Sequence, residues 1–219
     1  MRQLVHFTHK NNLKSILIHG LLGRDKLDQY NFQGYRANDE MRLDDQRGAV
    51  CISVTFPNYK MFFKYRNITG KDDKNQWVVI CLSESLLWEL ECKFYSTNAA
   101  SNDAKESELN GSRKSVYDFK EMFGNLPDKS RKYLGIPDDY TTDPQAEILV
   151  LEPIPVKYIK SVDFFDEHTS NLWLATNEDY NKIPGLKFYY SDRFFKPRDD
   201  YSYWKRKNPF SFNNPFSSN

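Results

Sequence analysis

A single carboxylate opens a short apolar run about two-thirds of the way along the chain. Glu147 stands directly before residues 148–151 (Ile-Leu-Val-Leu), with Pro144 just upstream and Pro153 just downstream. Short apolar runs that are bounded by turn-forming residues are typical of buried strands. We therefore expect a buried strand at 145–151 whose leading edge carries an acid.

The rest of the chain is built from elements of similarly short length. Polar stretches at 23–47 and 96–115 interrupt the pattern, and the first is long enough to suggest a function of its own. Short strands mixed with short helices favour an α+β domain over a regular parallel βαβ sheet. Further strands are predicted at 4–8, 49–56, 77–82 and 161–165, and helices at about 12–20, 57–66, 84–91 and 119–123.

The length of 219 residues fits one catalytic domain, which we place at 1–192, followed by a basic and aromatic tail at 193–219. The last dozen residues are expected to be poorly ordered. The formal net charge is +1, so no global basic field attracts nucleic acid. Any contact with nucleic acid must therefore come from a local patch.

Cysteine usage and hydropathy predict a cytoplasmic protein. The three cysteines show no CxxC spacing, which indicates neither a disulfide framework nor a zinc site, and we expect no metal. The N-terminus lacks the apolar stretch of a signal peptide. Nothing in the sequence reaches the roughly 18 apolar residues that a membrane span needs, so no membrane partner is expected.

Two pairs of polar residues share a face of a predicted strand, because residues i and i+2 point the same way. His6 and Thr8 could grip the ribose and amide of a nicotinamide, or could form the outer face of a half-exposed strand. Ser53 and Thr55 could line the same site, or could simply reflect a composition rich in β-forming residues.

Arginines and aromatic residues supply further candidates. Arginine suits a pyrophosphate through bidentate bonds, although an arginine among carboxylates also fits a solvated ion-pair cluster. The helix at 57–66 could be a stacking platform for a single-stranded base or an ordinary core helix. The segment 201–207 combines aromatic and basic residues in the same way. The candidate substrate contacts are Arg47, Ser53, Thr55, Tyr59 and Tyr65.

Three segments together resemble the DarT family: His6-Phe7-Thr8-His9, the run 12–22, and 145–150 (Gln-Ala-Glu-Ile-Leu-Val) followed by Pro155. DarT proteins are toxins of bacterial toxin–antitoxin and anti-phage systems. They resemble diphtheria- and PARP-like ADP-ribosyltransferases, and they link ADP-ribose from NAD to a base in single-stranded DNA. The resemblance implies split central β-sheets with flanking short helices, NAD as co-substrate, and a partner antitoxin whose macrodomain removes the mark.

Carried over to this chain, the resemblance makes Glu147 the catalytic acid, which would bind the 2′-hydroxyl of the nicotinamide ribose. It also implies a catalytic arginine in the loop before the second strand, for which Arg42 is the first choice, Arg47 the second and Arg36 the third. The NAD site implied by the family comprises His6, Phe7, Thr8, Ser15, Gly23 and Arg42.

The middle of the chain departs from the better-known members of that family. They carry a His-Asp-Tyr run in the strand where this chain has Val-Cys-Ile-Ser-Val-Thr-Phe at 50–56. That strand lies near the acceptor site, so the modified base stays open, as does the choice between single-stranded DNA and RNA.

Three hypotheses follow from the sequence. The leading one is an NAD-dependent mono-ADP-ribosyltransferase acting on a nucleobase, with NAD in a cleft between two small sheets. The second is a protein-modifying ADP-ribosyltransferase on the same scaffold. The third is a nucleic-acid-binding module without NAD chemistry, which would use 57–66 and 201–207.

Overall fold

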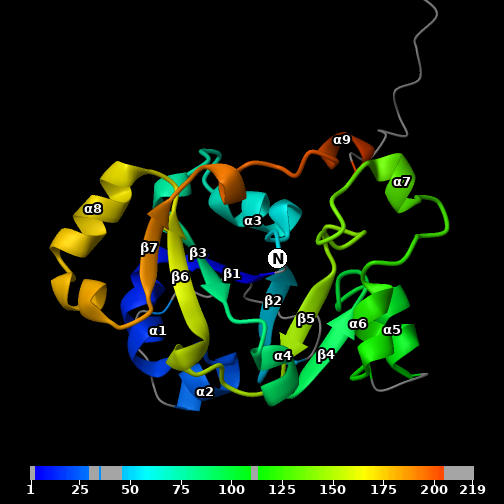
Figure 1. Ribbon diagram of the computed structural model, residues 1–219, viewed down its shortest axis with the longest axis horizontal. Coiled ribbons are helices and arrows are strands. Elements are labelled where there is room, and N and C mark those ends of the chain that lie inside the picture. The colour runs from blue at the N-terminus through cyan, green and yellow to red at the C-terminus, as the bar shows by residue number, and fades with distance from the viewer. Residues whose placement is uncertain (1–2, 30–34, 36–45, 110–112, 205–219) are drawn as a thin grey trace, which may run out of the picture.

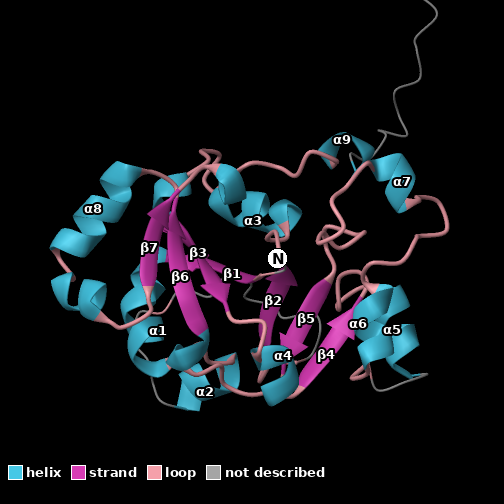
Figure 2. Cartoon of the chain, in the orientation of Figure 1, coloured by secondary structure: helices cyan, strands magenta, loops and turns pink. Residues whose placement is uncertain are grey.

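A computed structural model describes residues 3–29, 35, 46–109 and 113–204. Its centre is a seven-stranded sheet in the order β4-β5-β2-β1-β3-β6-β7, with helices packed around it (Figures 1 and 2). The strands are β1 (Leu4–His9), β2 (Val50–Val54), β3 (Trp77–Leu82), β4 (Cys92–Tyr95), β5 (Glu147–Val150), β6 (Ile159–Phe164) and β7 (Lys187–Tyr190).

Short helices connect these strands, and several begin at a polar residue whose side chain accepts a backbone N–H. Ser115, Ser130 and Asp166 cap α6, α7 and α8 in this way. The helices are α1 (Leu13–His19), α2 (Arg24–Gln29), α3 (Tyr59–Arg66), α4 (Leu86–Glu89), α5 (Asn102–Leu109), α6 (Val116–Glu121), α7 (Arg131–Leu134), α8 (Glu167–Ala175) and α9 (Tyr201–Trp204). Single 3₁₀ turns include η1 (Lys10–Asn12), η2 (Lys74–Gln76), η3 (Val156–Tyr158), η4 (Glu178–Lys182) and η5 (Arg193–Phe195).

The sheet divides at its centre, between β1 and β2. Strand β1 pairs with β3 along all six of its residues, but it pairs with β2 only at Leu4↔Val54 and Val5↔Ser53. We call β1, β3, β6 and β7 the first wing, and β2, β5 and β4 the second wing. The predicted α+β class with a split central sheet is therefore confirmed (Figure 1).

Apolar side chains cover both faces of the first wing. Successive residues of β1 point to opposite faces, so Leu4 joins one buried cluster with Leu13 of α1, while Val5 joins another with Phe62 of α3. All of these side chains are at most 1% exposed. Burial of this apolar surface fixes α1 and α3 on opposite sides of β1.

Most strands lie where the sequence predicts them, and the differences concern short or edge elements. The helix predicted at 84–91 is reduced to the single turn of α4, and the sequence pattern does not indicate α5, α7, α8, α9, β4 or β7. Strand β7 is an edge strand that pairs in parallel with β6, and Tyr189 and Tyr190 are 47% and 54% exposed. A half-exposed edge strand has no clear apolar alternation, which explains why the sequence pattern does not show it.

The tail predicted from residue 193 begins with residues that pack into the fold. Phe194 and Phe195 of η5 are buried in the aromatic cluster beside α3, and Arg198 and Asp200 are buried further along. A domain boundary after residue 192 stays a prediction. The last dozen residues, which are expected to be poorly ordered, lie outside the described residues.

Candidate active site

Glu147 is the first residue of β5, so the acid stands at the leading edge of a strand as the sequence predicts, although the predicted strand begins two residues earlier. Its backbone lies opposite Tyr95 of β4, and the residue is 9% exposed. Oε1 of Glu147 accepts a hydrogen bond from the backbone N–H of Ala99 at 2.6 Å. The acid is therefore held both by a strand and by a backbone amide, which is the rigid mounting that a catalytic carboxylate needs.

Asp143 links the turn before Glu147 to the segment that carries Ala99. One carboxylate oxygen accepts from the backbone N–H of Gln145 at 2.7 Å, and the other accepts from the hydroxyl of Thr97 at 2.8 Å. The backbone N–H of Ala146 also bonds to the Asp143 carbonyl. This Asx turn sets the direction in which the chain enters β5.

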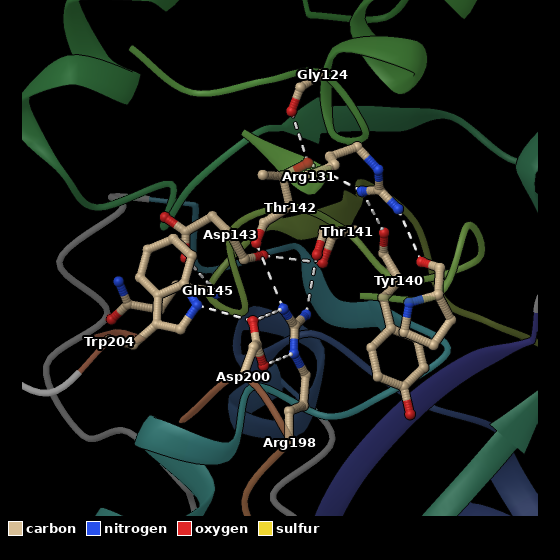
Figure 3. A network of polar contacts seen from close by, with 11 residues as sticks. Gly124, Arg131, Tyr140, Thr141, Thr142, Asp143, Gln145, Arg198, Asp200 and Trp204 are labelled. Atoms are coloured by element: carbon tan, nitrogen blue, oxygen red, sulfur yellow. Dashed lines mark hydrogen bonds and ion pairs between the residues drawn. The ribbon is translucent and has the colours of Figure 1, made fainter. Parts of the chain in front are cut away.

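Two arginines, one just upstream and one near the C-terminal end of the described chain, hold the segment 137–146 that precedes β5 (Figure 3). Arg131 of α7 donates to the carbonyls of Pro137 and Tyr140, each at 2.8 Å, and to the hydroxyl of Thr142 at 3.0 Å. Arg198, near the C-terminal end of the described chain, donates to the Thr141 carbonyl of the same segment. The sequence pattern identifies neither arginine: Arg198 has partners more than 50 positions away, and Arg131 stands in a polar stretch without a recognisable motif.

His6 and Thr8 lie on the face of β1 that α1 covers, and their cross-strand partners are Ile80 and Val78. Nδ1 of His6 lies 2.8 Å from the carbonyl oxygen of Cys51 in β2, so this side chain bridges the two wings. Because a carbonyl only accepts, Nδ1 carries the proton in this bond.

Thr8 is 2% exposed, and its hydroxyl accepts a hydrogen bond from the side-chain amide of Asn12 at 3.0 Å. The predicted common face of His6 and Thr8 is therefore confirmed. Their role in binding NAD stays a prediction.

Phe7 points to the opposite face of β1. Its ring stacks on Phe62 at 4.7 Å between centroids, and Tyr65 and Trp77 lie 6.2 and 6.3 Å away. The structure therefore places Phe7 and Tyr65 in the aromatic cluster of α3 and does not bring them to the face of His6 and Thr8.

Ser15 and Gly23, the other residues of the predicted NAD site, lie outside β1. Ser15 is half-buried on α1. Gly23 packs against the backbone of Gly48 so closely that a Cβ atom would lie 2.1 Å from the Gly48 carbonyl oxygen. This contact requires glycine at position 23 whether or not a cofactor binds there.

Of the three candidate arginines, the structure describes Arg47 alone. Arg36 and Arg42 lie outside the described residues. Arg47 is exposed and pairs with Asp28 of α2 at 2.8 Å, and the hydroxyl of Tyr35 donates to the same carboxylate at 3.0 Å. The hydrogen bond from Tyr35, followed by that from Arg47, lowers the pKa of Asp28.

Ser53 and Thr55 are both buried, and Thr55 ties the end of β2 to the segment before Glu147. Its hydroxyl donates to the carbonyl of Asp139 at 2.8 Å, and its φ angle is 62°, which is rare for a β-branched residue.

Tyr59, a further candidate contact, is the first residue of α3. Its buried hydroxyl has no hydrogen-bond partner among the described residues, and burial, with a smaller effect of Asp200, raises its pKa.

The two predicted basic-aromatic segments meet in space. The Lys60 ammonium lies 5.2 Å from the ring centre of Trp204, and Tyr59 packs edge-on against Tyr201 at 5.5 Å. The first turn of α3 therefore contacts α9. Residues 205–207 of the predicted cluster lie outside the described residues.

Within the described ranges, no group of three His, Cys, Asp or Glu residues is placed to hold a metal ion. No described helix is long and apolar enough to cross a membrane.

A family model described as ssDNA thymidine ADP-ribosyltransferase, DarT, matches residues 5–177. The chain belongs to the DarT family. The family is one of NAD-dependent ADP-ribosyltransferases, so the chain is an enzyme of the glycosyltransferase type. A comparison with curated proteins finds none that matches the chain.

Solved structures of similar fold carry DarT descriptions. Thermus sp. 2.9 DarT in complex with NAD+ has a TM-score of 0.55 at 13% identity, over 88% of this chain and 96% of that one. The same protein in complex with ADP-ribosylated ssDNA has a TM-score of 0.56 at 14% identity, over 88% and 95%. Thermosipho africanus DarTG in complex with ADP-ribose has a TM-score of 0.61 at 14% identity, over 89% of this chain.

This chain spans only 51% of the length of the Thermosipho chain. At these identities the structural matches show the fold, and they confirm the ADP-ribosyltransferase-like architecture that the sequence predicts. Membership of the DarT family favours the nucleobase-modifying hypothesis over the other two.

Proposed function

We propose that this chain transfers ADP-ribose from NAD+ to a base of single-stranded DNA, with Glu147 as the catalytic carboxylate. The observation that carries the proposal is the buried Glu147 at the head of β5, fixed by the Ala99 amide, in a chain of the DarT family. Cleavage of the glycosidic bond of NAD+ passes through an oxocarbenium-like state. A fixed carboxylate beside the ribose stabilises that positive charge.

The reaction replaces one glycosidic bond by another. A nucleophilic atom of the base attacks the anomeric carbon of the nicotinamide ribose, the bond from that carbon to the nicotinamide nitrogen breaks, and nicotinamide leaves. The base loses its proton to solvent or to a nearby group. Glu147 binds the ribose 2′-hydroxyl through this step.

NAD+ would lie where the two wings separate. His6 of the first wing bonds to Cys51 of the second, and Thr8 follows on the same face, so these side chains lie beside the point where β1 and β2 diverge. The complex of Thermus DarT with NAD+ supports NAD+ as co-substrate. We propose Ser15, Gly23 and Phe7 as secondary candidates for contacts with NAD+.

Arg42 is proposed to bind the pyrophosphate or to stabilise the base as its proton leaves. Arginine stays protonated, so it acts by its charge and its hydrogen bonds and not as a general base. Arg47 is the alternative, although its bond to Asp28 must break first. Ser53, Thr55, Tyr59 and Tyr65 are the proposed contacts on the acceptor side.

The acceptor is proposed to be thymidine in single-stranded DNA, which the family description and the complex of Thermus DarT with ADP-ribosylated ssDNA both support. A toxin role follows from the same family, and we propose an antitoxin with a macrodomain that removes the mark. The DarTG description of the Thermosipho chain supports such a pairing. Both NAD+ and DNA are present in the cytoplasm, the proposed location.

Incubation of the purified protein with labelled NAD+ and separate pools of single-stranded DNA, RNA and total protein tests this proposal. We expect label on DNA with the wild type and none with Glu147→Ala. Label on RNA or on protein alone would move the acceptor to that polymer. Absence of label in every pool would contradict the proposal.

A further inference from the structure

A buried ion pair lies near the C-terminal end of the described chain. Arg198 is 4% exposed and Asp200 is 2% exposed. Nε and Nη2 of Arg198 donate to the two carboxylate oxygens of Asp200 at 2.9 and 2.5 Å, and the indole N–H of Trp204 donates to the same carboxylate at 2.8 Å. This bidentate arrangement fixes the orientation of the guanidinium and places its positive charge against the carboxylate.

The outer edge of the same guanidinium contacts the segment 137–146. Nη1 of Arg198 donates to the Thr141 carbonyl at 3.0 Å, and Nη2 lies 3.4 Å from the Thr142 carbonyl (Figure 3). The guanidinium carbon also lies 5.2 Å from the ring centre of Tyr140. One cation thereby contacts three successive residues that are more than 50 positions away in the sequence.

From these residues a short series of hydrogen bonds leads to Gln145, two residues before Glu147. The Thr141 hydroxyl donates to the Asp143 carbonyl, and the Asp143 carboxylate accepts from the Gln145 amide. Glu147 begins β5 two residues later. A shift of Thr141 would therefore be transmitted to the turn that sets the entry into β5.

Stability alone does not explain this pair. An apolar pair of similar volume often stabilises a protein as well as a buried ion pair does. An apolar pair cannot donate hydrogen bonds to the carbonyls of Thr141 and Thr142. The pair also lies beyond residues 5–177, the part that the family model matches.

We propose that Arg198 and Asp200 are positioning residues that fix the segment 137–146 and, through it, the carboxylate of Glu147. This inference rests on the proposed transfer reaction and extends it to residues outside the matched part of the chain. Small displacements of catalytic groups reduce turnover strongly, by up to about a hundredfold for a shift of about 1 Å.

The test replaces both charges at once by Arg198→Met with Asp200→Leu, which leaves no unpaired buried charge. We expect a kcat for ADP-ribosyl transfer to single-stranded DNA that is lower by about tenfold or more. The KM for NAD+ should stay within about twofold, because the pair does not contact the proposed NAD+ site. The Tm should stay close to that of the wild type, because an apolar pair of similar volume often stabilises a protein as well as a buried ion pair does. A folded double variant with the kcat of the wild type would overturn the proposal.

Arg66→Met is the matched control. Arg66 is 5% exposed and donates to the Phe195 carbonyl at 3.0 Å, so it anchors the same C-terminal segment to α3 without contacting 137–146. This variant should lower Tm and leave kcat unchanged below the unfolding transition. An equal fall of kcat in both variants would assign Arg198 a merely structural role and overturn the proposal.

Amide hydrogen exchange separates this proposal from the proposed function. In the double variant the amides of Thr142 and Ala146 should exchange faster, whereas the β1–β3 ladder should be unchanged. If the wild type modified no DNA, the proposed function would fail. Unchanged exchange at these amides in the double variant would overturn the positioning role by itself.

If the double variant does not fold, Arg198→Lys provides the test, because lysine cannot bind the carboxylate and both carbonyls together. It should show the same fall in kcat, and wild-type kcat would contradict the proposal.

Discussion

The two wings of the sheet hold their proposed site residues by different means. In the first wing, His6 and Thr8 lie on a central strand that pairs with β3 along its whole length and is covered by apolar side chains on both faces. In the second wing, Glu147 heads a four-residue strand, and the segment before it is held by the side chains of Thr97, Arg131 and Arg198. Backbone register places the first set, whereas the second depends in addition on polar side chains from other segments.

One buried carboxylate of the first wing and one that lies beside the second wing also differ in their partners. In the first wing, Asp163 of β6 accepts hydrogen bonds from two neutral groups, the Cys81 thiol at 3.4 Å and the Ser161 hydroxyl at 3.3 Å. Beside the second wing, Asp200 is paired with the guanidinium of Arg198. Substitutions in the apolar core of the first wing should change mainly stability, whereas those around the segment before β5 should also lower kcat.

The largest effect on stability is expected for Phe62→Ala in the aromatic cluster of the first wing. Phe62 is 1% exposed and packs on Phe7, Trp77 and Phe195. Its loss should lower the free energy of unfolding by about 3–5 kcal/mol. Phe63→Ala, at a residue that is 49% exposed, should cost less than about 0.5 kcal/mol. Equal losses in urea denaturation would contradict the assignment of Phe62 to the core.

Arg131→Met probes the second wing. Its hydrogen bonds to Pro137, Tyr140 and Thr142 predict a loss of about 2 kcal/mol in the free energy of unfolding, and a fall in kcat measured well below the unfolding transition. The neighbouring exposed residue provides the control Lys132→Met, which should leave both quantities unchanged. Loss of stability with kcat preserved would remove the contrast between the wings.

His6→Ala tests the bridge between the wings. The side chain that bonds to Cys51 is also proposed to contact NAD+, so we expect the KM for NAD+ to rise about tenfold, equivalent to about 1.4 kcal/mol. His19→Ala, at the exposed end of α1, should leave KM unchanged in the same steady-state assay. A normal KM in the His6 variant would remove this residue from the proposed site.

The smallest effect is a pH dependence of stability that arises from Asp163. Burial raises the pKa of this carboxyl above its ordinary value, so the folded state holds its proton more tightly than the unfolded chain does. The contribution of Asp163 to stability therefore rises as pH falls through the folded pKa, and at neutral pH the ionised form opposes folding.

Asp163→Asn should accordingly raise Tm near pH 7, and the gain should shrink as pH falls toward 4. Asp179→Asn, at a side chain that is 95% exposed, should show no such trend in thermal melts across this pH range. A gain that grows toward low pH would have the wrong sign.

The sequence is sufficient where structure follows from local pattern. The apolar run after Glu147, the alternation in 4–8 and the apolar stretch 77–82 are local signals, and the structure has strands at each. The family resemblance likewise rests on short motifs within β1, α1 and β5.

What the sequence does not reveal depends on contacts between distant residues. The family resemblance predicts Gly23 as a cofactor contact, yet its close approach to Gly48 is sufficient to require glycine there. In the sequence, Arg198 and Asp200 are ordinary charged residues of a predicted tail. The contacts of Arg198 with Thr141 and Thr142 are seen only in the structure. A charged side chain is usually exposed, and only the fold shows that this pair is buried.

The most direct test of the account is mass spectrometry of a thymidine-containing single-stranded oligonucleotide after incubation with NAD+ and either the wild type or Glu147→Gln. Glutamine keeps an oxygen for the bond from the Ala99 amide, so the variant should fold with a Tm close to that of the wild type. We predict one added ADP-ribose with the wild type and a rate lower by about 100- to 1000-fold with the variant. Modification at the wild-type rate by folded Glu147→Gln would contradict the central role of this carboxylate.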